Sequence, residues 1–160
     1  MELKIIFDIF PIISIVVCLV IVLVKYIRNK SLSWIYLRNY FFLNLIAVMG
    51  IGSGIGHIIF AGRISSSLNY NTGFQKEIGF VNIAFGIGAI YGLNKIDRIG
   101  SIEITNYIRG LGIPYSVFLL LAGLNHVYDS MTKPLERNIK IFTIYDLLFS
   151  LVFIVLMLQI

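Results

Sequence analysis

Five long apolar stretches, separated by short polar segments, constrain the fold of this chain more than any other feature of its sequence. They run from about Ile5 to Val24, between Arg38 and Arg63, between Glu77 and Lys95, between Arg109 and Asp129, and from Ile141 to Ile160. Each is long enough, or nearly so, to cross the ~30 Å hydrocarbon layer as a helix. Only 13% of the residues are charged, about half the share in soluble domains. We therefore expect an integral membrane protein whose main partner is the lipid bilayer.

The apolar stretches predict helices rather than strands. They are about twice the length of a barrel strand and show no sustained alternation of apolar and polar residues. A helix also satisfies its own backbone hydrogen bonds in lipid. We predict an all-α bundle of five transmembrane helices at about 5–27, 37–61, 75–94, 104–128 and 139–160, in one domain that spans 1–160. The segment from Gly62 to Thr72 is expected to be a polar loop with room for one interfacial turn.

Composition and motifs exclude several classes of function. The net charge is +5, but the Lys and Arg residues are spread in ones and twos, so no basic stripe indicates nucleic-acid binding. Cys18 is the only cysteine, which excludes an internal disulfide framework. The chain contains no P-loop, HExxH or nucleophile elbow. These patterns give no support for an enzyme.

The basic residues of the short loops predict the orientation. The segment before the first helix carries one, Lys4, whereas four lie around the first loop: Lys25, Arg28, Lys30 and Arg38. Alternating loops carry seven basic residues against six on the other side, so the first helix gives the clearest contrast. Cytoplasmic loops carry the excess of Lys and Arg. We therefore expect a protein of the cell membrane with its N-terminus outside and its C-terminus in the cytoplasm.

Polar residues of the predicted helices fall at one depth. Odd-numbered helices begin, and even-numbered helices end, on the same side of the membrane. Asp8 lies near the start of the first helix, His57 near the end of the second and His126 near the end of the fourth. Polar residues inside spanning helices usually face a bundle interior or a cavity. The candidate ligand- or proton-binding residues, expected in the extracytoplasmic leaflet, are His57, Gln75, Glu77, Asn82 and His126, followed by Asp129 and Asp146.

Helical spacing indicates that some of these residues share faces with glycines. One stripe of small and polar side chains recurs every three or four residues at Gln75, Gly79, Asn82, Gly86 and Ala89. A second stripe contains Gly50, Gly54 and His57. Glycines at such spacing allow helix backbones to approach closely in lipid. We expect the glycines to serve packing and the polar residues to meet inside the bundle.

Four hypotheses account for this polar layer. It relays protons or binds a small polar substrate in a transporter, which would then form a homo-oligomer. It only fixes helix packing in a structural or accessory subunit. His57 and His126 coordinate a b-type haem. The two histidines, with Glu77 and Asp129, bind a divalent metal ion.

One part of the sequence resembles a known family. The matching residues are Gly56-His57, followed by Phe74-Gln75-x-Glu77-x-Gly79-x-x-Asn82-x-x-x-Gly86. They are similar to an uncharacterised family of small prokaryotic multi-pass membrane proteins, in which a Ser-Pro stands where this chain has Thr72-Gly73. The family is distantly similar to the DoxX-like group. The resemblance implies that His57, Gln75, Glu77 and Asn82 belong together, and it implies no activity.

Overall fold

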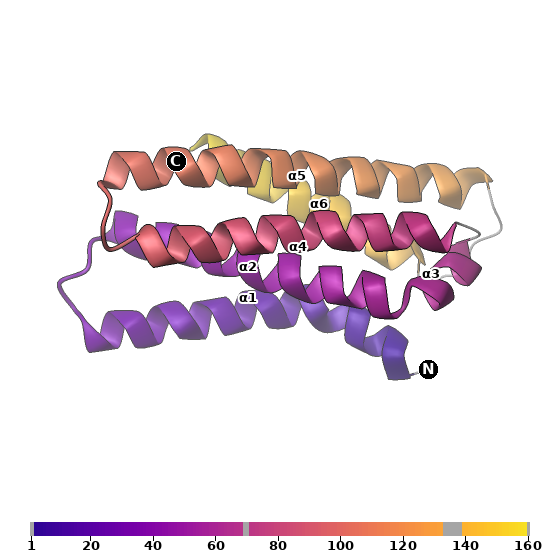
Figure 1. Cartoon of the computed structure of the whole chain (residues 1–160), viewed down its shortest axis with the longest axis horizontal. Helices are drawn as coiled ribbons and strands as arrows, with labels where there is room; N and C mark the ends of the chain where they lie inside the picture. Colours follow the sequence, from indigo (N-terminus) through magenta and orange to yellow (C-terminus); the bar gives the residue numbers. More distant parts are fainter. Residues whose placement is uncertain (1, 69–70, 133–138, 160) are drawn as a thin grey trace. The chain divides into compact units, whose positions relative to one another are not determined.

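The computed structural model describes the backbone of residues 2–68, 71–132 and 139–159, and within these ranges the described side chains are those of 10–66, 71–125, 127–128, 131–132, 147–148, 150–156 and 158–159. In these described ranges the chain is helical apart from short turns and loops, and it contains no strand. The six helices are α1 (Glu2–Arg28), α2 (Trp34–Ile59), α3 (Ala61–Leu68), α4 (Thr72–Lys95), α5 (Ser101–Thr132) and α6 (Ile139–Leu158). Figure 1 labels them along the chain. The all-α prediction is confirmed.

Within the described part of the chain, four helical segments are long and apolar enough to cross a membrane. They are Phe10–Arg28, Trp34–Ile59, Thr72–Lys95 and Ser101–Asn125. The prediction of five helices is wrong in number because the polar segment after α2 forms α3. Serines cluster in α3, which has eight residues and would span only about 12 Å. It is too short to cross the bilayer, so it adds a helix without adding a span.

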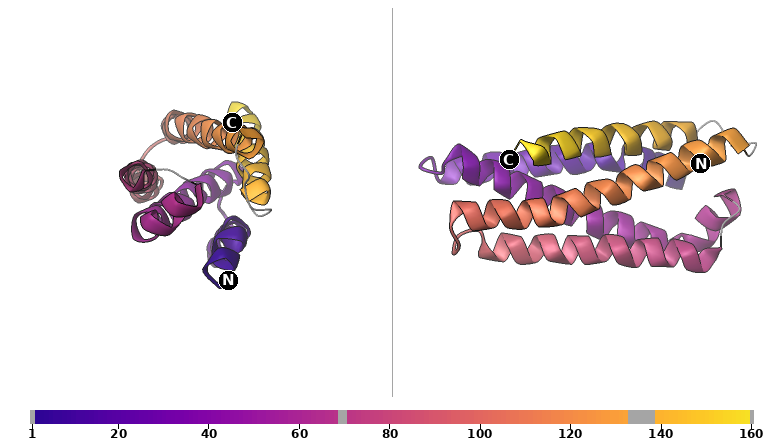
Figure 2. Two further views of the ribbon diagram at one scale, coloured as in Figure 1. Left: turned by 90° about the vertical axis from the view of Figure 1, so that its right-hand side faces the viewer. Right: turned by 90° about the horizontal axis from the view of Figure 1, so that it is seen from above.

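The described chain forms two compact units. One contains residues 9–108, and the other contains 1–8 and 109–160. In the first unit, α2 and α4 lie side by side along most of their length, and α3 packs mainly on α4. Figure 2 shows the antiparallel run of α2 and α4 from two further directions. In the second unit, α5 approaches α6 where Gly123 lies against Leu147.

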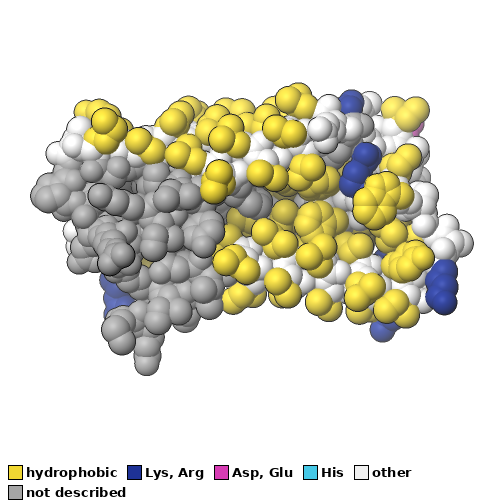
Figure 3. All heavy atoms as spheres, turned by 180° about the vertical axis from the view of Figure 1, so that it is seen from behind, with side chains coloured by type: hydrophobic (Ala, Val, Ile, Leu, Met, Phe, Trp, Pro, Cys, Tyr) yellow, Lys and Arg dark blue, Asp and Glu magenta, His cyan; other side chains and the backbone are white. Residues whose placement is uncertain are grey.

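α1 contributes an exposed hydrophobic surface to the unit of residues 9–108. Among its described side chains, ten large hydrophobic ones are exposed, including Val16, Leu19 and Leu23. One contact with α2 is close, because a side chain at Gly52 would collide with the ring of Phe10. On one face of the molecule, hydrophobic side chains dominate the described surface and Lys and Arg gather towards one end (Figure 3). Apolar surface of this kind favours a lipid environment over water.

Candidate functional site

Glycines hold α2 and α4 backbone to backbone. A Cβ atom at Gly50 would lie 2.7 Å from the carbonyl oxygen of Asn82, and one at Gly54 would lie 2.7 Å from that of Gly79. The reverse is also true, because a Cβ atom at Gly79 would lie 2.8 Å from the oxygen of Gly54. At Gly86 it would lie 2.9 Å from the nitrogen of Ile51. We call these four glycines, Gly50, Gly54, Gly79 and Gly86, the glycine seam.

The seam continues into the predicted polar stripe. The buried residues of α4 are Gln75, Gly79, Asn82, Gly86, Ala89 and Gly92. The first five are the residues that the helical spacing placed on one face, so that prediction is confirmed. Because glycine brings the two backbones together, the longer polar side chains of the same stripe are enclosed as well. Gln75 is only 2% exposed and Asn82 only 3%.

His57 meets Gln75 at one end of the seam. The ring nitrogen Nδ1 lies 2.9 Å from the amide oxygen Oε1 of Gln75. The contact is possible because His57 follows Gly54 by three residues on α2, while its Cβ atom faces Gly79 on α4. The two residues are 18 positions apart in the chain. The structure therefore joins two candidate residues that the sequence placed at one depth.

This hydrogen bond determines which nitrogen of the imidazole ring is available. An amide oxygen only accepts hydrogen bonds, so Nδ1 of His57 donates the hydrogen. In the neutral ring the second nitrogen, Nε2, then carries the lone pair. His57 is partly exposed, whereas Gln75 is buried. The arrangement presents Nε2 as an acceptor for a proton or for a hydrogen-bond donor.

Asn82 supplies a second acceptor on the same stripe. Its side-chain nitrogen donates to the carbonyl oxygen of Ile78 at 3.0 Å. Its oxygen Oδ1 is buried and has no hydrogen-bond partner among the described residues, and the same holds for the hydroxyl of Ser65 on α3. A buried polar atom without a partner loses the free energy of its hydration. Asn82 lies two turns, about 10 Å, along α4 from Gln75.

The remaining candidates are placed differently. Glu77 lies on α4 but is exposed, so it does not belong to the buried stripe that contains Gln75. The side chains of His126, Asp129 and Asp146 lie outside the described residues, as does that of Asp8. His126 and Asp129 belong to α5, and Asp146 belongs to α6.

The described residues supply no set of ligands for the haem or the divalent-metal hypothesis. Among the side chains that the structure describes, no three His, Cys, Asp or Glu residues gather closely enough to hold a metal ion. Both hypotheses require His126, which lies outside that set. Haem and divalent-metal binding therefore stay predictions.

The sequence analysis missed a second group of buried polar residues, which lies at the other end of the same unit. Asn39 is fully buried near the start of α2, and its side-chain nitrogen donates to the hydroxyl of Thr105 at 3.2 Å. Asn44 is 9% exposed, and its side chain donates to the carbonyl oxygen of Tyr40. The signal of both residues was present, because Asn is costly in a spanning helix unless it is bonded.

Ring and charge contacts surround this end. The hydroxyl of Tyr36 donates to Asp97 at 2.6 Å, and the ammonium group of Lys25 lies 4.0 Å from the same carboxylate. That ammonium group also lies 5.3 Å from the ring centre of Tyr40. The contacts join the end of α1, the start of α2 and the segment after α4. No local pattern predicts them, since Tyr36 and Asp97 are 61 residues apart.

Comparison with known proteins gives one match. A family model covers residues 8–160, and its description is "Family of unknown function (DUF6790)". No curated protein and no solved structure matches the chain.

Proposed function

The chain belongs to the DUF6790 family of unknown function, and we propose that this membrane protein exchanges protons through His57 in a transport-type function. This membership agrees with the expected uncharacterised family, while the signature residues and the DoxX likeness stay predictions. The observation that carries the proposal is the 2.9 Å contact between His57 Nδ1 and the buried Gln75. It leaves Nε2 as the proton acceptor.

The surroundings of His57 support this role. Histidine is the side chain whose unperturbed charge change falls nearest to neutral pH. On the same buried stripe, Asn82 adds an acceptor oxygen that no described residue bonds. Such an atom can receive a hydrogen bond from a small polar ligand or a water molecule that carries the proton. Gln75 orients the imidazole ring and cannot itself titrate.

The basic residues support an extracytoplasmic position for this site. At the end of the unit that contains Asp97, six basic residues lie on or next to α1, α2 and α4: Lys25, Arg28, Lys30, Arg38, Lys95 and Arg98. Two, Arg63 and Lys76, lie at the end that contains His57. The positive-inside rule then favours a cytoplasmic position for the Asp97 end. His57 would face the outside.

Proton flux into liposomes tests the proposal. The purified protein is reconstituted with the pH dye pyranine inside, and a potassium diffusion potential is imposed with valinomycin. We expect the internal pH to change several-fold faster than in protein-free liposomes, and His57→Ala to return the rate to the protein-free level. Asn44→Ala is the matched control, because Asn44 is a polar residue of α2 whose side chain bonds its own helix. A wild-type rate equal to that of empty liposomes would contradict the proposal.

The glycine seam favours a second candidate, a structural or accessory membrane subunit. Backbone contact at Gly50 and Gly54 is the arrangement that stabilises helix pairs in lipid, and the His57–Gln75 hydrogen bond would then only fix their register. This role predicts that His57→Ala and Gln75→Leu both lower the melting temperature in detergent and that no variant changes proton flux. A flux that depends on His57 would contradict it.

Metal content tests the haem hypothesis and the divalent-metal hypothesis. A histidine that donates one ring N–H to a carbonyl group has the arrangement found at metal ligands. Mass spectrometry of the purified protein measures the bound metal, with the double variant His57→Ala, His126→Ala beside it. Stoichiometric iron that is lost in the variant would support haem, and zinc, copper or manganese would support a metal site. Equal metal content in both proteins would contradict both.

A further inference from the structure

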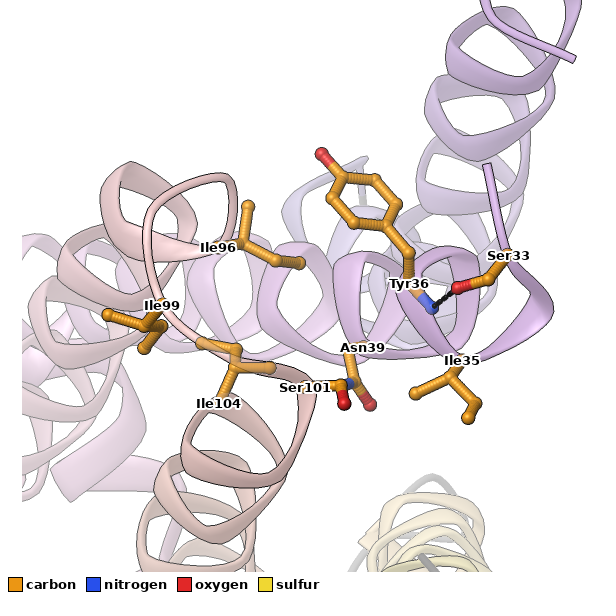
Figure 4. A pocket seen from close by; sticks show the side chains of 8 residues that line it. All are labelled: Ser33, Ile35, Tyr36, Asn39, Ile96, Ile99, Ser101 and Ile104. Carbon is orange, nitrogen blue, oxygen red and sulfur yellow. Dashed lines mark hydrogen bonds between the residues drawn. The ribbon is translucent and has the colours of Figure 1, made fainter. Parts of the chain in front are cut away.

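A cavity at the other end of the unit of residues 9–108 has one polar side and one apolar side. Its volume is about 130 Å³, which is below the roughly 300 Å³ at which pockets for drug-sized ligands begin. Figure 4 shows the residues that line it, which come from the start of α2, the segment after α4 and the start of α5. The polar lining is Ser33, Tyr36, Asn39 and Ser101, and the apolar lining is Ile35, Ile96, Ile99 and Ile104.

The guanidinium group of Arg38, which does not itself line the cavity, contacts Asn39 of the polar lining. Nε and Nη2 of Arg38 donate to the side-chain oxygen of Asn39 at 3.4 and 3.3 Å. These distances are long for hydrogen bonds, and a guanidinium group has five N–H donors. The other three donors of Arg38 have no partner among the described residues. Arginine is the residue best suited to bind phosphate with two parallel hydrogen bonds.

The surrounding charges are mostly positive. Lys25, Arg28, Lys30, Lys95 and Arg98 lie at the same end of the unit. Two acids also lie near the cavity. Asp97 already accepts from Tyr36 and lies near Lys25, and the exposed Glu103 folds back over Gly100. The balance favours an anion.

Side chains next to the cavity are of the kind found at the membrane interface. Trp34, the first residue of α2, is 77% exposed and lies between Ser33 and Ile35 of the cavity lining. An exposed Trp at the end of a spanning helix is typical of the membrane interface. Ile35, Ile99 and Ile102 expose apolar surface around it, at 45%, 38% and 73%. Such a rim suits acyl chains, which a free anion lacks.

We propose that this cavity binds the phosphate headgroup of an anionic phospholipid, with Arg38 as its main cationic ligand. Asn39 holds the guanidinium group in place, and Ser33 and Ser101 offer hydroxyl donors to the remaining oxygens. The acyl chains lie outside, along the exposed isoleucines. Basic pockets between spanning helices are known to bind anionic headgroups on the cytoplasmic side of membranes. The inference is independent of His57.

Fluorescence of the only tryptophan tests the proposal. Trp34 adjoins the cavity, so bromine on a bound lipid quenches it. The full-length protein is reconstituted in phosphatidylcholine vesicles that contain increasing amounts of either brominated phosphatidylglycerol or brominated phosphatidylcholine. We expect stronger quenching by the anionic lipid at equal amounts. Arg38→Ala should lower the relative binding constant for the anionic lipid about fivefold, the effect of one basic contact.

Matched variants separate the site from general charge. Arg63→Ala removes an exposed Arg at the opposite end and should leave the quenching unchanged, while Arg38→Lys should retain part of the preference. Circular dichroism confirms that each variant is folded. Equal quenching by the two lipids in the wild type, or equal effects of Arg38→Ala and Arg63→Ala, would overturn the proposal. A last control adds inorganic phosphate at roughly 10 mM, which is well above the dissociation constant of a specific site. If phosphate relieves the quenching, the cavity binds a free anion, and the proposal of a lipid headgroup is overturned.

Discussion

At the scale of single residues, His57 and Gln75 are expected to be energetically coupled. Their hydrogen bond joins α2 to α4, and polar contacts between spanning helices contribute about 0.6 kcal/mol on average and about 1.7 at most. A double-mutant cycle of His57→Ala and Gln75→Ala should give a coupling energy in this range. The measurement is the free energy of unfolding in mixtures of dodecylmaltoside and SDS.

A second cycle serves as its control. Asn44 bonds the carbonyl oxygen of its own helix, so Asn44→Ala and His57→Ala should be additive within about 0.5 kcal/mol. Coupling as large in the control cycle as in the first would contradict a direct His57–Gln75 interaction.

Asn82→Leu should separate stability from function. In the described part of the chain the oxygen Oδ1 has no hydrogen-bond partner, so removal of the amide relieves an unfavourable burial. The carbonyl oxygen of Ile78, which accepts from the amide, keeps its place in the backbone hydrogen bonds of α4. We expect the free energy of unfolding to stay equal or to rise, while proton flux falls. A loss of more than about 2 kcal/mol would show instead that Asn82 is a structural residue.

At the scale of helices, the glycine seam predicts sharp size limits. In Gly54→Ala the new methyl group would lie 2.7 Å from the carbonyl oxygen of Gly79, so the helices must separate. Overpacking of this kind destabilises by about 1–3 kcal/mol. Gly62→Ala is the matched control because no atom of the described residues lies within 4 Å of its Cβ position. The control should be neutral or slightly stabilising, and equal losses in both variants would contradict the seam.

The same elements show what the sequence predicts well. The periodicity of Gln75, Gly79 and Asn82 is local, and one helix face must be buried whichever neighbour covers it. The burial of the stripe therefore follows from spacing alone. The pairing of His57 with Gln75 could be predicted from their common depth in the membrane, because two consecutive antiparallel helices bring the end of the first helix beside the start of the second.

Other features required the tertiary structure. α3 was missed because a short helix with several serines resembles a polar loop in composition. The contact of Tyr36 with Asp97 joins segments 61 residues apart, and the cavity exists only where such segments converge. Glu77 stands two residues from Gln75, and in a helix that spacing places it on another face. Glu77 is therefore exposed while Gln75 is buried.

At the scale of the whole molecule, the proposed orientation can be tested with cysteines. The natural Cys18 is fully buried, so it should not react with an impermeant maleimide. Ser31→Cys and Ser66→Cys each place a thiol at an exposed position, before α2 and on α3. In intact cells we expect Ser66→Cys to be labelled and Ser31→Cys to be labelled only after permeabilisation. The reverse pattern would contradict the orientation with its N-terminus outside.

The glycine seam also has a genetic consequence. Every single-nucleotide change in a glycine codon that alters the protein introduces a side chain or a stop, since no smaller amino acid exists. At Gly50, Gly54, Gly79 and Gly86 each such side chain would meet an atom of the neighbouring helix within 3 Å. We therefore expect every missense change that a single nucleotide can cause at these codons to destabilise the protein. A saturation library should recover almost only synonymous changes there. Gly62 and Gly110, whose Cβ positions no described residue approaches within 4 Å, should accumulate substitutions.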